Sequence, residues 1–114
     1  VAGVTTMIWD LHCHLSGVRG RTPAERMAEL VRYADRMGIA RLVVFMGMRF
    51  AQDPSADDLR RQNDEVLEAL AHWHDRAFGF VYLSPRHVAT SLAELDRCVR
   101  DGPMVGVKLW VAGR

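Results

Sequence analysis

Ala40-Arg41-Leu42-Val43-Val44-Phe45-Met46 is apolar at every position except Arg41. A strand with one solvated face alternates apolar and polar residues, whereas a strand of a parallel sheet is covered on both faces and is apolar nearly throughout. This run therefore predicts a buried strand of an α/β protein. The segments on either side of it indicate how the sheet is built.

A helix is predicted immediately before this strand. In Thr22-Pro23-Ala24-Glu25, Thr22 can accept a hydrogen bond from the third helical amide and Glu25 can return one. Pro23 fits the first helical position, where no amide partner is needed. Gly38 suits a left-handed residue at the end of the helix.

Three further strands and two further helices are predicted, in alternation along the chain. The strands are expected over residues 7–12, 77–83 and 104–109, so the order along the chain is βαβαβαβ. The second helix is expected to begin at Ser55 or Asp57 and to run to about residue 73. The third is expected over residues 89–100, and three of its apolar residues are expected to face the sheet: Leu92, Leu95 and Val99.

Units of this length predict a parallel sheet with right-handed crossovers, for which two architectures remain. One is a small open sheet with helices on both faces, which the length favours. The other is the first half of a (β/α)8 TIM-like barrel, which polar residues at the strand ends favour. We predict the half-barrel, as a single partial domain over residues 1–114, with residues 1–6 as a remnant of a segment preceding Met7.

Composition excludes several classes of protein. Hydrophobic residues make up 49% and charged residues 25% of the 114 residues, and the net charge is +1 with interspersed signs, so neither disorder nor a nucleic-acid or membrane partner is indicated. No apolar run is long enough to span a membrane. Two cysteines do not make a disulfide framework. A cytoplasmic protein is expected.

Asp10-Leu11-His12-Cys13-His14 is the first candidate site. Alternate side chains of a strand point the same way, so His12 and His14 face one side together and Cys13 faces the other. Two neutral imidazoles at this spacing suit zinc and neighbouring transition metals. The alternative is a pair of polar residues hydrogen-bonded at a strand exit. We predict that His12 and His14 are metal ligands.

Lys108 is the second candidate. It is the single lysine of the chain and lies among apolar residues near the end of the last expected strand. A desolvated amine there can add carbon dioxide and become a carbamate, an anionic oxygen ligand, which arginine cannot do. Lys108 is therefore a predicted metal ligand and catalytic residue. A non-ligating active-site role and a simple strand-end lysine remain open.

Other candidates carry weaker signals. His72 and His74 also form a His-x-His pair, but at a helix end, where residues two apart point in different directions. His87 and Arg86 follow the third expected strand, where the histidine could face a pocket and the arginine could bind a substrate carboxylate. Structural roles are the stronger expectation for all four.

The sequence resembles the metal-dependent amidohydrolase superfamily, in particular its amidohydrolase-related branch. Three stretches carry the resemblance: Ile8 to His14, Gly79-Phe80-Val81-Tyr82-Leu83-Ser84-Pro85 and Val105-Gly106-Val107-Lys108-Leu109. The resemblance implies a distorted barrel with one or two divalent ions, zinc foremost, at the carboxyl ends of its strands. His12 and His14 match the first-strand ligands, and Lys108 stands where some members carry a carboxylated, metal-bridging lysine.

The function implied is metal-dependent hydrolysis of an amide or ester-like bond in a small molecule. The family's remaining ligands and its proton-shuttling aspartate belong to later strands. The second half of the barrel is therefore expected from the same or another chain, and a homo-oligomer is expected. The alternatives are an amidohydrolase-related decarboxylase, a TatD-type or PHP-type phosphoesterase, and a non-catalytic half-barrel that serves as an assembly partner.

Overall fold

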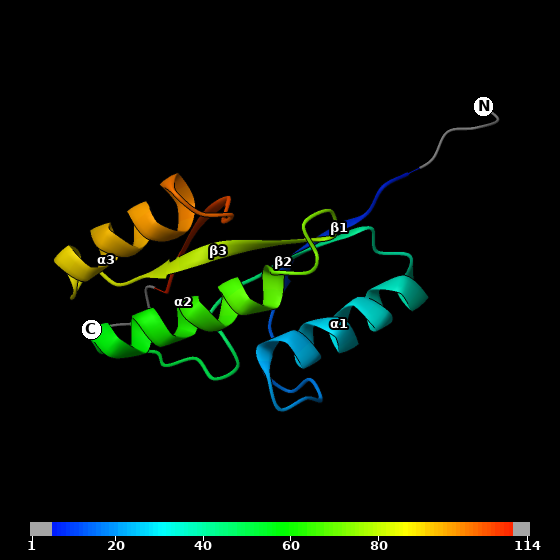
Figure 1. Cartoon of the computed structure of the whole chain (residues 1–114), viewed down its shortest axis with the longest axis horizontal. Helices are drawn as coiled ribbons and strands as arrows, with labels where there is room; N and C mark the ends of the chain where they lie inside the picture. The colour runs from blue at the N-terminus through cyan, green and yellow to red at the C-terminus, as the bar shows by residue number, and fades with distance from the viewer. Residues whose placement is uncertain (1–5, 111–114) are drawn as a thin grey trace.

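The computed structural model describes residues 6–110, and its elements follow the predicted order βαβαβαβ (Figure 1). They are β1 (Trp9–Cys13), α1 (Pro23–Met37), β2 (Arg41–Val44), α2 (Ala56–Leu70), β3 (Ala77–Leu83), α3 (Val88–Leu95) with its π-helical extension η1 (Asp96–Arg100), and β4 (Gly106–Leu109). Residues 1–5, most of the predicted N-terminal remnant, lie outside the described residues. No helix within residues 6–110 is long and apolar enough to cross a membrane.

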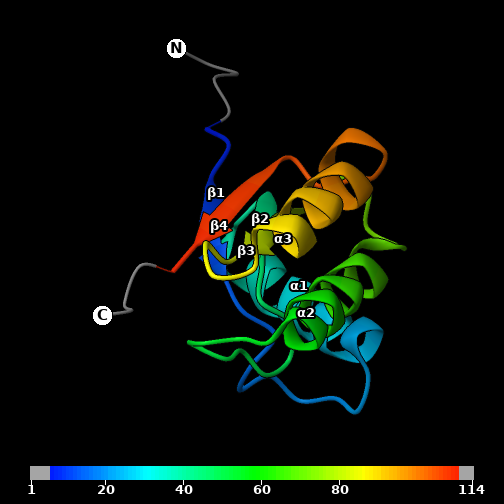
Figure 2. The same cartoon turned by 90° about the vertical axis from the view of Figure 1, so that its left-hand side faces the viewer.

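All strand pairs are parallel, and the sheet order β1-β2-β3-β4 is the order of the chain. A doubly wound sheet reverses its strand order at a switch point and carries helices on both faces. Here the order never reverses, and the three helices lie on one side of the sheet (Figure 2). The half-barrel prediction is confirmed, and the open-sheet alternative is wrong.

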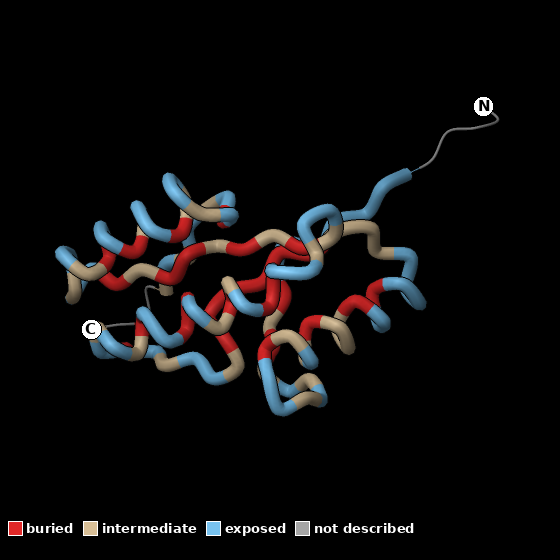
Figure 3. The backbone as a smooth tube through the Cα atoms, in the orientation of Figure 1, coloured by how far each residue is buried: buried red, intermediate tan, exposed pale blue. Residues whose placement is uncertain are grey.

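The alternation of side chains along the strands builds two separate cores. Figure 3 shows that buried residues recur along both the strands and the helices. On the helix side, strand residues such as Val44, Ala77 and Val81 pack against the helices. On the concave side, the buried residues include Val43, Phe45 and Tyr82. The strands therefore have two apolar faces, as the continuous apolar run of β2 predicted.

The predicted ends of α1 are confirmed with one difference. Thr22 Oγ1 accepts a hydrogen bond from the Glu25 amide at 3.1 Å, and Gly38 ends the helix with φ of 71°. The Glu25 carboxylate accepts from the amide of Arg21 at 2.7 Å rather than from that of Thr22. The amide that bonds the Glu25 side chain is thus that of the residue before the N-cap, rather than that of the N-cap itself as in a regular capping box.

Ser55 and Asp58 form a reciprocal capping box at the start of α2. The Asp58 amide donates to Ser55 Oγ at 3.1 Å, and the Ser55 amide donates to the Asp58 carboxylate at 3.0 Å. Ser55→Ala should lower the free energy of unfolding by about 1 kcal/mol, measured by urea denaturation. Ser55→Asn, which can still cap, should lose only a few tenths. Equal losses from both variants would contradict this assignment.

The expected inward face of α3 is wrong in part. Leu92 is 58% exposed, whereas Ser91, Glu94 and Cys98 are buried. The reason is that the Glu94 carboxylate is satisfied inside the protein: Asn63 donates to it at 3.1 Å and Arg97 at 2.7 Å. A carboxylate with these partners can occupy an inward position, which rotates Leu92 outward. Leu95 and Val99 pack against the helix-side core as expected.

Both edge strands carry large exposed apolar side chains. Trp9 and Leu11 on β1 are 46% and 58% exposed, and Val107 and Leu109 on β4 are 43% and 53% exposed. Unpaired, apolar strand edges are surfaces that proteins normally cover. These two edges are where a closed barrel would add its neighbouring strands.

Candidate metal centre

His12 and His14 point their ring nitrogens at each other at the carboxyl end of β1. The two Nε2 atoms are 3.1 Å apart, and the rings meet nearly edge to face at 80°. Two nitrogens each about 2.0–2.1 Å from a tetrahedral zinc ion are separated by roughly 3.3 Å. The hydrogen-bonded separation of the pair is therefore close to that of two ligands of one transition-metal ion, and the predicted common facing of the two histidines is confirmed.

A β-bulge in β1 determines on which face of the sheet the two imidazoles lie. Trp9 and Asp10 pair with consecutive residues of β2, but Cys13 pairs with Val44, so one residue of β1 is extra. The Asp10 carboxylate accepts a hydrogen bond from the His12 amide at 3.0 Å, which holds the bulged backbone. Bulges re-aim side chains and are common next to active sites. Here the bulge turns Cys13 into the helix-side core and leaves both imidazoles on the concave side.

The surroundings of His14 favour its neutral form. Its Nδ1 lies 3.4 Å from the Phe45 carbonyl oxygen, so Nδ1–H can donate there while the Nε2 lone pair accepts from Nε2–H of His12. Burial lowers the pKa of His14 below its ordinary value, the positive charges of His12 and Lys108 lower it further, and the Phe45 carbonyl only partly opposes this. A metal ion binds the neutral imidazole, so these effects favour ligation.

The lowered pKa of His14 predicts a loss of stability in acid. The unfolded chain takes up a proton near the ordinary histidine pKa of about 6.5, before the folded chain does. Stability should therefore be complete above that pH and should fall as the pH drops toward the lower pKa of the folded state. NMR titration of the His14 ring in metal-free protein measures that pKa directly. His14→Gln should remove this part of the acid sensitivity, and an unaltered acid dependence would contradict the assignment.

Lys108 shares the pocket with the two histidines. The pocket has a volume of about 290 Å³ and is lined by His12, His14, Met46, Phe50, Lys108 and Trp110. Lys108 comes from β4, where it pairs with Tyr82, and its Nζ lies 5.2 Å from the centre of the Phe45 ring. All three predicted site residues therefore line one pocket, although they come from opposite edges of the sheet.

The pocket also contains residues that sequence reasoning missed. Phe50 lies 5.0 Å from the His14 ring, and Trp110 lies 5.7 Å from Phe50, both measured between ring centres. Met46 adopts φ of 71°, a left-handed conformation that is rare and costly for residues other than glycine. Their positions at the carboxyl ends of strands were visible in the sequence, but their directions were not.

The other candidates do not join this pocket. The Cys13 thiol is buried, and burial, followed by the nearby Asp10 charge, raises its pKa to about 12, which disfavours the thiolate that a metal requires. His72 and His74 are exposed in the turn after α2. Arg86 pairs with Asp53 at 2.9 Å, linking the loops that follow β2 and β3. His87 is the residue that precedes α3, without a side-chain capping bond.

Within residues 6–110, no three histidine, cysteine or carboxylate side chains cluster in a way that could hold a metal ion. The described part of the chain thus offers two imidazole nitrogens and the amine of Lys108. Zinc sites commonly have four ligands in all.

The fold and the two imidazoles define the chain as a β/α half-barrel with a candidate metal centre at the carboxyl ends of its strands. The chain belongs to the amidohydrolase family, whose model matches residues 9–113. The resemblance inferred from the sequence is therefore confirmed.

A solved structure places this chain within a larger fold. The crystal structure of 2,6-dihydroxybenzoate decarboxylase from Rhizobium is similar, with a TM-score of 0.66 and 22% sequence identity. The match covers 90% of this chain and 38% of that chain, so this chain spans well under half of its relative's length. No curated protein matches the sequence.

Proposed function

We propose that this chain forms the N-terminal half of the active site of a metal-dependent hydrolase. One observation carries the proposal: the Nε2 atoms of His12 and His14 lie 3.1 Å apart, at a separation that suits one tetrahedral ion. Membership of the amidohydrolase family supports it. When bound, a divalent ion such as zinc supplies a Lewis acid that activates water near neutral pH and polarises a carbonyl group.

The chain's own residues prepare the site in three ways. His12 and His14 would hold the ion through their Nε2 atoms, and the Phe45 carbonyl orients the His14 ring through its Nδ1. Phe50 and Trp110 exclude water from one wall of the pocket, which strengthens electrostatic interactions within it. Lys108 supplies either a positive charge for the substrate or, after carboxylation, an additional oxygen ligand.

Carboxylation of Lys108 is proposed as the route to a second metal ion. The neutral amine adds the carbon of carbon dioxide and loses a proton, which leaves an anionic carbamate. Lys108→Arg keeps the positive charge but cannot form this ligand, so we expect it to lose the second ion and to retain the first. Metal content measured by atomic emission, together with a native mass increase of one carbon dioxide in the unmodified protein, tests this. Undiminished metal loading in Lys108→Arg and Lys108→Ala would contradict it.

The rest of the site is proposed to come from further strands of the barrel. The exposed apolar side chains on β1 and β4 mark the two edges at which such strands would pair. Those strands would supply the remaining ligands and the base that accepts a proton from water. They are contributed by the same polypeptide or by a partner chain, and assembly into a homo-oligomer is part of the proposal.

Decarboxylation of an aromatic acid is the second candidate function, and the lining of the pocket favours it. The rings of Phe50 and Trp110 line the pocket together with Lys108, an arrangement of flat apolar surfaces and an amine that suits a flat anionic substrate. The structural relative named above is a decarboxylase by its description.

A single experiment separates the two functions. The full-length, zinc-loaded protein is incubated with a panel of simple esters and amides and with a panel of hydroxybenzoic acids. Acid or alcohol release that stops on chelation supports the hydrolase, and carbon dioxide release from the hydroxybenzoates supports the decarboxylase. Full metal loading with neither product would support the non-catalytic assembly partner.

A further inference from the structure

The loop between β2 and α2 is held unusually close to α2. It begins with two left-handed residues, Met46 with φ of 71° and Gly47 with φ of 69°. A Cβ atom on Gly47 would lie 2.5 Å from Glu65 Oε1 and 3.1 Å from the backbone of Gln62. Only glycine therefore allows the loop to approach the helix at this point.

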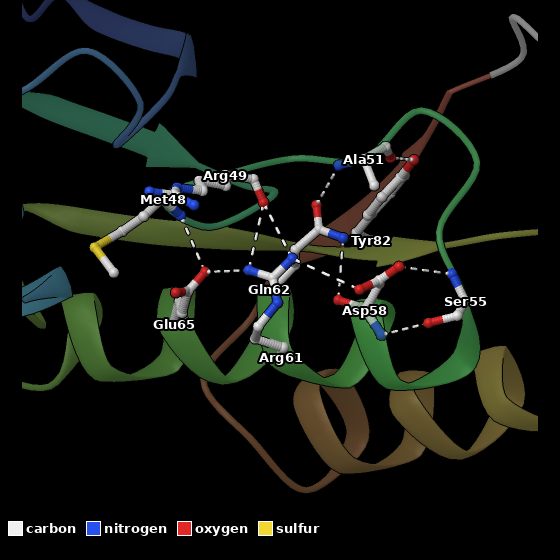
Figure 4. Close-up of polar contacts among 9 residues, drawn as sticks. All are labelled: Met48, Arg49, Ala51, Ser55, Asp58, Arg61, Gln62, Glu65 and Tyr82. Carbon is white, nitrogen blue, oxygen red and sulfur yellow. Dashed lines mark hydrogen bonds and ion pairs between the residues drawn. The ribbon is translucent and has the colours of Figure 1, made fainter.

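Four side chains bind the backbone of this loop, one of them being Arg61, which donates to the Arg49 carbonyl at 3.4 Å (Figure 4). Glu65 Oε1 accepts from the Met48 amide at 3.1 Å, and Gln62 Oε1 accepts from the Ala51 amide at 3.2 Å. Tyr82 Oη donates to the Ala51 carbonyl at 2.9 Å, so both polar backbone groups of Ala51 are held by side chains. We call Gln62, Glu65 and Tyr82 the loop clamp.

The loop clamp encloses the residue that forms a wall of the pocket. Phe50 lies between the anchored Met48 and Ala51, and its ring contacts both His14 and Trp110. Gln62 is completely buried, and its Nε2 donates to the Asp58 carbonyl of its own helix. A buried amide is costly unless both its ends are bonded. Because both ends of the Gln62 amide are bonded, its side chain is fixed and holds Ala51 rigidly.

We propose that the loop clamp positions Phe50 over His14 and so determines the shape of the pocket that a planar substrate group enters. Gln62, Glu65 and Tyr82 are thus positioning residues that act through the loop and do not line the pocket themselves. The importance of that pocket rests on the proposed function. The position of Phe50 does not, because it can be measured in protein without metal.

The test uses the ring protons of His14 as a reporter in the full-length, metal-free protein. Their NMR chemical shifts depend on the nearby aromatic ring of Phe50, so Phe50→Leu defines the displacement that results when that ring is removed. Spectra are recorded at a fixed pH above 8, where histidine with its ordinary pKa of about 6.5 is neutral. His14→Gln identifies the signals.

Tyr82→Phe removes only the hydroxyl group, and Gln62→Met removes only the amide at similar volume. We expect both to shift the His14 signals most of the way toward their position in Phe50→Leu. Tyr33→Phe, which changes an exposed tyrosine of α1, should leave them in place. Zinc affinity should stay within a few-fold in all three variants, because none of these residues is a ligand.

If the His14 chemical shifts in a folded Tyr82→Phe protein equal those of the unmodified protein, the proposal is overturned. The hydrogen bonds of the loop clamp would then only stabilise the loop. If Gln62→Met does not fold, Tyr82→Phe alone decides the result. The proposed function fails differently: it requires zinc binding that depends on His12, which this experiment leaves unaltered. If the His14 signals shift in the loop-clamp variants but the unmodified protein does not bind zinc, the result would support the loop clamp and contradict the metal site.

Discussion

Replacing His12 by alanine is expected to remove zinc binding from this protein. The two Nε2 atoms, 3.1 Å apart, are the proposed nitrogen ligands that the described residues bring together. Loss of one leaves a single imidazole. Removing a residue that only supports a ligand lowers metal affinity by about 10- to 100-fold, and removing a ligand itself should lower the zinc affinity by more than that. Competition with a fluorescent chelator measures the affinity in the full-length protein.

The second His-x-His pair is a matched control for this experiment. His74→Ala changes an exposed histidine with the same local sequence pattern, but in the turn that follows a helix rather than at the end of a strand. Its zinc affinity should equal that of the unmodified protein. Equal losses in His12→Ala and His74→Ala, or full binding in His12→Ala, would mean that the ligands have been assigned wrongly.

Replacing Asn63 by alanine is expected to have the largest effect on stability. Pairing between β2 and β3 ends at Val44 and Gly79, and Asn63 from α2 then takes the place of a neighbouring strand. Its Oδ1 accepts from the Tyr82 amide at 2.8 Å, and its Nδ2 donates to the Tyr82 carbonyl at 3.1 Å. Both groups would lose their partner, so the free energy of unfolding should fall by about 3–5 kcal/mol.

The same substitution disturbs a buried carboxylate. Burial alone would raise the pKa of Glu94, but hydrogen bonds from Arg97 and Asn63 outweigh it and hold the pKa below its usual range. Glu68→Ala, at an exposed position of the same helix, should change stability by less than about 0.5 kcal/mol. Urea denaturation compares the two variants. A loss below about 1 kcal/mol in Asn63→Ala would contradict a strand-replacing role.

The sequence was sufficient to predict the fold because its signals are local. The apolar run of β2, the capping residue Thr22, the helix start near Ser55 and the terminating Gly38 each depend on neighbours in the chain, and the structure bears them out. Leu92 was misplaced because the inward position of Glu94 depends on Asn63, which lies far away in the sequence. Periodicity alone cannot show that a carboxylate will find buried partners.

The residues of the candidate site likewise fall into those that local sequence signals predicted and those that they did not. The common direction of His12 and His14 follows from strand geometry, and the structure adds a bulge that no local signal indicated. Placing Lys108 beside them required the curvature of the sheet, which brings β4 toward β1 across Phe45. Phe50 was missed because its direction depends on the path of a loop, which hydrogen bonds from other elements fix.

The most direct test of the metal centre is a crystal structure of the full-length protein grown with zinc, with anomalous data collected on both sides of the zinc absorption edge. We expect an anomalous peak about 2.0–2.1 Å from Nε2 of both His12 and His14, beside Lys108. A fully loaded crystal with zinc elsewhere, for example at His72 and His74, and none between His12 and His14 would contradict it.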